Sequence, residues 1–176
     1  MHETDGVDPT PYEIERKFLL EAPDLAALER AATSSSEIEQ IYLDDRGAGA
    51  ERVRRRVRLD ADGPRTELTH TRKVAVSAGV AEEYEVDVDE TAYADLLARA
   101  DPARVPVLKT RWVVPHGDLV LEVDRIREPR ELWLLEVELA DPGDLHARLD
   151  LPTWVGPHVE VTGDERYANR SLALPG

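Results

Sequence analysis

The stretch EIERKFLL at residues 13–20 decides the fold of this chain. Successive side chains of a β-strand point to opposite faces, so Glu13, Glu15 and Lys17 share one face of a strand. Ile14 lies on the other face, which is mainly apolar. Two carboxylates and an ammonium group in a row suit a divalent cation that is held beside an anion.

The same alternation returns along the chain, with charges of one sign on the polar face of most strands. A solvated sheet face usually mixes signs, whereas a closed antiparallel barrel with its charges inside explains the segregation. Charges in such an interior must be paired or occupied, because an unpaired buried charge is very costly. The acid pairs also have a purely structural interpretation, as salt-bridge partners of the arginines. The acidic faces carry Glu13 and Glu15, Glu83, Glu85 and Asp87, Glu122 and Asp124, and Glu136 and Glu138. The basic faces carry Arg52, Arg54, Arg56 and Arg58, Lys73, and Lys109 and Arg111.

The predicted fold class is α+β and mainly antiparallel β, an eight-stranded closed tunnel barrel with a few flanking helices. Strands are predicted near 11–20, 37–44, 51–59, 66–75, 81–88, 106–115, 118–127 and 132–140. Helices or helical turns are predicted at 24–32, 91–100, 142–149 and 164–174. We expect a disordered lead-in at residues 1–10 and a single domain over residues 11–174.

The composition of the chain restricts the cellular compartment and the binding partners that we expect. The chain has 176 residues, no cysteine and a formal net charge of −15. Without cysteine there are no disulfides or thiolate zinc sites, so a metal site would use oxygen or imidazole ligands. General nucleic-acid binding needs a basic field, which this charge opposes. No apolar run approaches the ~20 residues of a membrane span and no secretory signal is recognisable, so we expect a cytoplasmic protein.

Interior charges of both signs suit a phosphate-rich ligand. Arginine and lysine would bind phosphate oxygens, and carboxylates would hold Mg²⁺ or Mn²⁺, which prefer oxygen ligands and bridge to phosphates. Residues two apart on a strand lie roughly 6.5 Å from each other, so two carboxylates there can lean toward one ion or two neighbouring ions.

These motifs, in this order, resemble the CYTH family of triphosphate tunnel metalloenzymes over nearly the whole chain. The opening E-x-E-x-K motif is matched by Glu13, Glu15 and Lys17. A single such motif is weak evidence, whereas an ordered set is specific. The other segments that resemble family motifs are residues 51–56, 71–73, 83–85, 109–112, 122–124, 135–139, 152–156, 160–164 and 167–169.

The resemblance implies an eight-stranded tunnel that binds a triphosphate, with roles for individual residues. The opening motif, Glu13, Glu15 and Lys17, would be catalytic. The phosphate-binding residues would be Arg52, Arg54, Arg56, Lys73, Lys109 and Arg111. The metal ligands would be Asp124, Glu136 and Glu138 for one ion and Glu13 and Glu15 for a second. The additional tunnel acids would be Glu83, Glu85 and Glu122.

The chain departs from the family pattern at two places. Ala81 stands where the family often has an arginine, so one phosphate contact is missing or comes from Arg72 or Arg56. Residues 131–133 replace a Gly-Leu loop and could reshape one mouth of the tunnel. The alternation alone leaves open which of the arginines at 52–58 lie at the centre of the tunnel.

The predicted function is hydrolysis of triphosphates with Mg²⁺ or Mn²⁺, and inorganic triphosphate is the favoured substrate. In the expected mechanism a metal-bound water attacks the terminal phosphorus in line, without a covalent phospho-enzyme. The alternatives are thiamine or nucleoside triphosphatase, class IV-type adenylate cyclase, and a non-catalytic module that binds triphosphate or polyphosphate. The expected partner is a small-molecule triphosphate, not nucleic acid or a membrane. A homodimer is compatible with the sequence, which marks no interface.

Overall fold

The structure is a computed structural model that describes residues 12–60 and 62–175. The predicted lead-in at 1–10 lies outside these residues. The strands are β1 (Tyr12–Leu20), β2 (Ser34–Tyr42), β3 (Ala50–Asp60), β4 (Gly63–Ser77), β5 (Val80–Asp87), β6 (Val107–His116), β7 (Leu119–Glu128), β8 (Leu132–Glu138) and β9 (His158–Glu160). The helices are α1 (Leu25–Ala31), α2 (Glu90–Leu97) and α3 (Asn169–Leu172), with 3₁₀ turns at Pro142–His146, Thr153–Val155 and Glu165–Tyr167.

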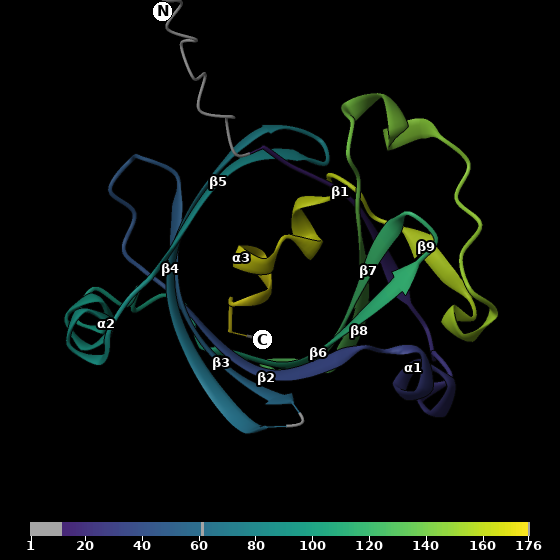
Figure 1. The fold of residues 1–176 in the computed structure, drawn as a ribbon. Helices are drawn as coiled ribbons and strands as arrows, with labels where there is room; N and C mark the ends of the chain where they lie inside the picture. The colour runs from purple at the N-terminus through teal and green to yellow at the C-terminus, as the bar shows by residue number, and fades with distance from the viewer. Residues whose placement is uncertain (1–11, 61, 176) are drawn as a thin grey trace, which may run out of the picture.

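Eight antiparallel strands close into a barrel, which confirms the predicted fold class (Figure 1). The strand order is β5-β4-β3-β2-β6-β7-β8-β1, and the first half of β1 pairs with β5 to close the ring. The second half of β1 pairs instead with β9, a short strand that the sequence analysis did not predict. No helix in the described part of the chain is long and apolar enough to cross a membrane.

The apolar faces of the strands point outward, where helices cover them (Figure 1). Leu28 of α1 is fully buried in a cluster with Leu121 and other side chains from the outer faces of β1, β6, β7 and β8. Tyr93 of α2 packs in a second cluster with Val53 of β3. The side chain of Asp24 accepts a hydrogen bond from the backbone of α1, as the sequence predicts for a helix cap. The principal core therefore lies outside the barrel wall, which leaves the interior to polar groups.

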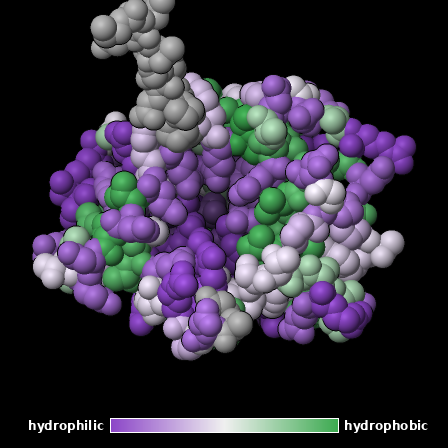
Figure 2. Space-filling model, viewed as in Figure 1, coloured by the Kyte–Doolittle hydropathy of each residue, from purple (hydrophilic) through white to green (hydrophobic). Residues whose placement is uncertain are grey.

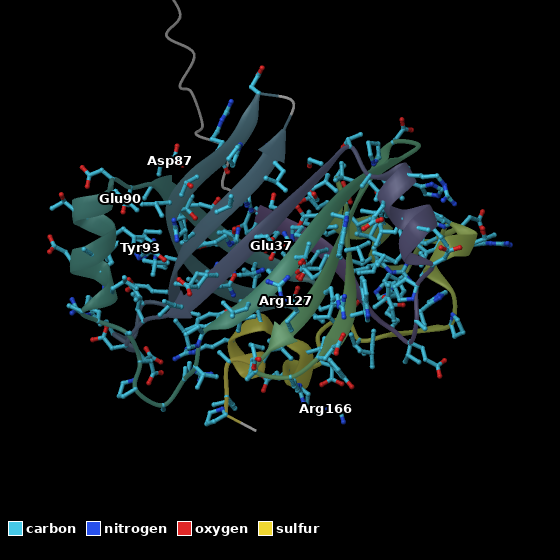
Figure 3. The ribbon with its side chains drawn as sticks, turned by 90° about the horizontal axis from the view of Figure 1, so that it is seen from below. Glu37, Asp87, Glu90, Tyr93, Arg127 and Arg166 are labelled. Atoms are coloured by element: carbon cyan, nitrogen blue, oxygen red, sulfur yellow. The ribbon has the colours of Figure 1, made fainter. Side chains whose placement is uncertain are left out.

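The C-terminal segment covers one end of the barrel. Figure 1 shows α3 inside the ring, and Figure 3 shows it at the end opposite the β3–β4 turn. The buried Leu172 and Ala173 pack there against inward-facing apolar side chains, which include Tyr42, Val107 and Leu134. The inner faces are therefore not charged throughout, because at this end they meet α3.

Arg16 attaches the C-terminal segment to the outside of β1. Its guanidinium donates to the Glu160 carboxylate at 2.8 and 2.7 Å and to the Ala147 carbonyl at 2.6 Å. The Thr162 hydroxyl accepts from the backbone N–H of Lys17 at 3.0 Å. These contacts explain why a cation interrupts the otherwise apolar face of the first strand.

We expect Leu172→Ala to lower the free energy of unfolding by about 2–5 kcal/mol, because it leaves a cavity in the apolar end of the barrel. Urea denaturation of the purified variant measures this. Leu174→Ala is the matched control, since Leu174 is 48 % exposed and should change the free energy by less than about 0.5 kcal/mol. Equal effects of the two substitutions would contradict the packing described for α3.

The contact of Glu160 with Arg16 predicts a pH-dependent stability. Hydrogen bonds from Arg16 and Thr162 lower the pKa of Glu160 from its ordinary value of 4.5. A carboxyl with a lower pKa in the folded state stabilises the protein above its unfolded-state pKa, and this stabilisation is lost as the pH falls through the folded-state pKa. Glu160→Gln should therefore lower the thermal midpoint more near neutral pH than at a pH well below 4.5. Glu29→Gln, at an exposed position on α1, should have a small effect at both pH values. A loss from Glu160→Gln that is the same at both would refute the ion pair.

Candidate functional site

A polar cavity of about 160 Å³ occupies the middle of the barrel. Figure 2 looks into the barrel from the end away from α3 and shows a hollow with hydrophilic walls. Every barrel strand except β2 contributes to the lining, together with one residue of α3. The lining residues are Glu13, Glu15, Arg52, Arg54, Arg56, Lys73, Glu83, Glu85, Arg111, Glu122, Glu136, Glu138 and Asn169.

The three remaining residues of the predicted site lie directly beside this cavity. Lys17 lines an adjoining cavity and contacts Glu136, with its Nζ 3.0 Å from the carboxylate. Lys109 and Asp124 are almost fully buried in the wall, with Lys109 Nζ 2.6 Å from Asp124 Oδ2. The structure thus brings all the predicted site residues together, and their roles remain proposals.

Strand register explains why opposite charges meet inside the barrel. Arg111 of β6 lies opposite Asp124 of β7. Glu136 of β8 lies opposite both Glu122 of β7 and Lys17 of β1. Directly opposite side chains share a face and lie close together. Arg111 with Asp124 and Lys17 with Glu136 are therefore ion pairs between neighbouring strands, whereas Glu122 and Glu136 are like charges on adjacent strands.

Arg111 is the centre of the buried ion pairs. Its guanidinium donates to both oxygens of Asp124 at 2.6 and 2.7 Å and to Glu136 at 2.8 Å, and it also contacts Glu122. Burial alone would lower its pKa, but the charges of Asp124 and Glu122 raise the pKa of Arg111 well above its ordinary value. Burial likewise opposes ionisation of Glu136, yet Lys17 and Arg111 hold the pKa of that carboxyl well below its usual range. These groups are charged together.

The corner of the cavity that β1 and β8 form, with Glu13, Glu15, Glu136 and Glu138, has more negative charge than its cations neutralise. Burial and the charge of Glu136 raise the pKa of Glu15 to about 7. Burial, then the charges of Glu122 and Glu13, raise the pKa of Glu138. The Oε1 atom of Glu136 is buried and lies 3.0 Å from Lys17 Nζ, its one ionic contact within the described part of the chain.

This corner has the donor chemistry of a Mg²⁺ or Mn²⁺ site, since all its ligands would be carboxylate oxygens. The raised pKa values of Glu15 and Glu138, each next to other carboxylates, fit the arrival of a cation. As the side chains lie, the described residues contain no ready-made group of three metal-binding side chains, since Asp124 and Glu136 are engaged by cations. A metal ion that binds here would therefore replace the ion pairs of these carboxylates by metal–oxygen bonds, because the ligands are not preformed as a group.

The arginine strand has Arg52, Arg54 and Arg56 on the cavity lining, which settles the register that alternation left open. Burial, with the charges of Arg52 and Arg111, lowers the pKa of Arg54 to about 10. Arg72 lies on the outer face, its guanidinium 4.8 Å from the ring centre of Tyr84. Arg72 therefore does not supply a tunnel contact in place of the arginine missing at Ala81.

A second cavity, of about 390 Å³, adjoins the first at the end that α3 covers. It lies between the β4–β5 turn and residues 161–170, and Ala81 is on its lining. The turn approaches this segment closely. A Cβ on Gly79 would lie 2.6 Å from the Glu15 carbonyl oxygen, and one on Gly163 would lie 2.6 Å from the Cβ of Ala78.

Two neutral residues at the site were not predicted. The chain contains one glutamine and one asparagine, Gln40 and Asn169. Gln40 is fully buried and accepts a hydrogen bond from Arg54, and Asn169 lines both cavities. The alternation of charges could not identify these two neutral residues. The fact that the chain uses only one glutamine and one asparagine could have drawn attention to them.

Comparisons with known proteins agree with this architecture. The family model of the CYTH domain matches residues 11–151. The inorganic triphosphatase of Nitrosomonas europaea (strain ATCC 19718) is 30 % identical over 163 residues, which cover 92 % of this chain and 97 % of that protein. The crystal structure of the inorganic triphosphatase NE1496 superposes with a TM-score of 0.53 and 29 % identity, covering 93 % of this chain and 97 % of that one. The PH1819 protein of Pyrococcus horikoshii OT3 shares the fold, with a TM-score of 0.55 and 19 % identity over 76 % of this chain and 81 % of that one.

Because other cations crowd around Arg54, we expect its replacement to weaken anion binding without lowering the stability of the anion-free protein. Arg54→Met should leave the thermal midpoint of the anion-free protein unchanged or higher, because it removes a charge from beside Arg52 and Arg111 while it keeps the apolar stem. Calorimetry should show pyrophosphate binding about tenfold more weakly to this variant, since a charged hydrogen bond to phosphate is lost. Arg72→Met, on the outer face, is the control and should bind pyrophosphate like the wild type. Equal affinity of Arg54→Met and the wild type would show that Arg54 does not meet the anion.

Proposed function

Because the chain belongs to the CYTH domain family, we propose that it hydrolyses triphosphates, with inorganic triphosphate as the favoured substrate. The observation that carries the proposal is the 160 Å³ cavity, in which arginines and a lysine face a corner with excess carboxylate. A triphosphate with a bound metal ion carries negative and positive charge, so it would complement both the basic and the acidic side of the cavity. The Nitrosomonas europaea relative, named an inorganic triphosphatase, supports the same substrate.

The basic wall would bind and orient the phosphate chain. Arg52, Arg54 and Arg56 reach the cavity from one strand and Lys73 from the next, so successive phosphate groups could be contacted along the barrel axis. Guanidinium groups match phosphate oxygens in geometry and charge. The same groups would stabilise the charge that develops on the terminal phosphate and on the leaving pyrophosphate.

The acidic corner would hold the metal, with Asp124, Glu136 and Glu138 as ligands of one ion and Glu13 and Glu15 beside a second. A divalent cation bound there supplies charge neutralisation and a bound water of lowered pKa. Lys17 would orient two of these carboxylates, since its Nζ lies 3.0 Å from Glu136 and 3.6 Å from Glu15.

Hydrolysis would proceed by direct attack of water. Water adds at the terminal phosphorus, the bond to the bridging oxygen breaks, and phosphate and pyrophosphate leave. Within the described chain, the lining of the 160 Å³ cavity contains no serine, cysteine or histidine. The proposal therefore includes no covalent phospho-enzyme.

An organic triphosphate is a second candidate substrate, favoured by the adjoining 390 Å³ cavity. Its volume falls in the range of small-molecule sites, which is roughly 300–1,000 Å³. Thiamine triphosphate and a nucleoside triphosphate are the two versions of this candidate. A cyclase would use the same cavities but release pyrophosphate and a cyclic nucleotide.

The first experiment is a product assay with inorganic triphosphate, ATP and thiamine triphosphate, each with Mg²⁺, Mn²⁺ or EDTA. We expect phosphate release from inorganic triphosphate that EDTA abolishes. Cyclic AMP and pyrophosphate from ATP would favour the cyclase. Binding without any product would favour a non-catalytic module.

Glu136→Gln should reduce turnover of inorganic triphosphate by at least about 10²-fold, because it removes a charge that the metal and its phosphates need. Phosphate release at saturating Mg²⁺ or Mn²⁺ measures this, and thermal unfolding checks that the variant is folded. Glu131→Gln is the control, since Glu131 pairs with Arg125 on the outside of the barrel and should retain full activity. Turnover near the wild-type value in a folded Glu136→Gln variant would refute the assignment.

A further inference from the structure

β2 differs from the other barrel strands on its inner face. Its inward side chains in the described structure are Ser34, Ser36, Ile38, Gln40 and Tyr42, so the face has no carboxylate, lysine or arginine. The strand lies between β3, which carries Arg52, Arg54 and Arg56, and β6, which carries Lys109 and Arg111. A neutral strand in this place leaves the charge of its neighbours uncompensated from that side.

Gln40 contacts the basic wall through Arg54. The two residues lie directly opposite each other on β2 and β3, so their side chains share the inner face. Nη2 of Arg54 donates to the Gln40 amide oxygen at 3.2 Å. The Gln40 amide nitrogen donates in turn to the Tyr42 hydroxyl at 2.8 Å. Since a guanidinium can only donate, the partners determine the orientation of the amide.

The charge of Arg54 is compensated less than that of Arg111. Arg111 is held by Asp124 and Glu136 at 2.6–2.8 Å, whereas the ion pair between Arg54 and Glu85 is 3.6 Å long. Burial and two neighbouring arginines lower the pKa of Arg54 to about 10, and its buried Nε has no hydrogen-bond partner among the residues that the structure describes. Arg54 is thus a cation that an anion in the cavity would relieve.

We propose that Gln40 is a positioning residue, which aims Arg54 at the bound phosphate chain without neutralising it. The inference deepens the proposed function and rests on its phosphate site. A neutral acceptor fixes the direction of the guanidinium while the positive charge stays available. A carboxylate in the same place would fix the direction as well, but it would compete with the phosphate for that charge.

Replacing Gln40 by glutamate tests the effect of a negative charge separately from the effect of side-chain geometry. Glu has the shape of Gln and can accept the same hydrogen bond from Arg54, and the Tyr42 hydroxyl can turn to donate to it. Gln40→Glu should therefore fold at least as stably as the wild type and bind phosphate more weakly. Gln40→Met keeps the length of the side chain and removes both hydrogen bonds, so it tests orientation alone.

Pyrophosphate binding in EDTA is the direct test, because it requires neither metal nor turnover. By calorimetry we expect Gln40→Glu to raise the dissociation constant about tenfold and Gln40→Met about threefold. The thermal midpoint should be unchanged or higher for Gln40→Glu and lower for Gln40→Met. Glu39→Gln is the control, since it changes one charge on the opposite face of the same strand and should alter the affinity less than about twofold.

A second variant shows whether the effect passes through Arg54. In an Arg54→Met background, Gln40→Glu should change the pyrophosphate affinity by less than about twofold. Equal weakening with and without Arg54 would overturn the inference. Wild-type affinity in Gln40→Glu would overturn it too, because Gln40 would then only pack.

Enzyme kinetics distinguish this inference from the proposed activity. With inorganic triphosphate, Gln40→Glu should raise KM more than it lowers kcat, whereas a general loss of structure would lower kcat with the amount of folded protein. A wild-type protein that binds pyrophosphate but hydrolyses nothing would refute the activity and leave the inference supported by the binding data. A wild-type protein that binds no pyrophosphate would overturn the inference together with the phosphate site.

Discussion

The cost of burying charge is the constraint on which this structure depends. Arg111, Asp124 and Glu136 are almost completely removed from water, and such groups are tolerated only when each is paired and hydrogen-bonded. The barrel meets this condition for these three residues by placing Arg111 of β6 beside Asp124 of β7 and within reach of Glu136 of β8. Because the polar groups occupy the interior, the apolar surface that drives folding must be buried outside, under α1 and α2.

The balance of charge inside the barrel is incomplete in two opposite directions. Glu15 and Glu138 lie where negative charge is in excess, and Arg54 lies where positive charge is in excess. Buried ion pairs contribute little net stability, so uncompensated charges of both signs are a poor way to hold a fold together. Such imbalance is typical of a site that is completed by its ligand, at some expense in the stability of the free protein.

The sequence predicted the barrel well because alternation is a local signal. The eight barrel strands were recognised from alternating charged and apolar residues, and Asp24 was recognised as a cap. The short β9 and the apolar end around Leu172 were not predicted, because both depend on distant contacts rather than on a periodic pattern. The charged residues of the site were found for the same reason as the strands. Gln40 was missed because a neutral side chain does not stand out in an alternation of charged and apolar residues. The cavity beside Gly79 was missed because it depends on how closely two backbone segments approach each other, which the composition does not reveal.

The register of β1 has a kinetic consequence. Lys17 finds its partner Glu136 on the last strand of the barrel, so the first strand to be synthesised cannot complete its pairing until nearly the whole domain is available. Contacts so distant in sequence make loop closure costly and folding slow, as in other barrels dominated by non-local pairing. Until that closure the carboxylates of β1 remain in water, where their charge opposes premature association of the exposed strand edges. The acidic face that would serve a ligand in the closed barrel would therefore also disfavour pairing of open strand edges before the barrel closes.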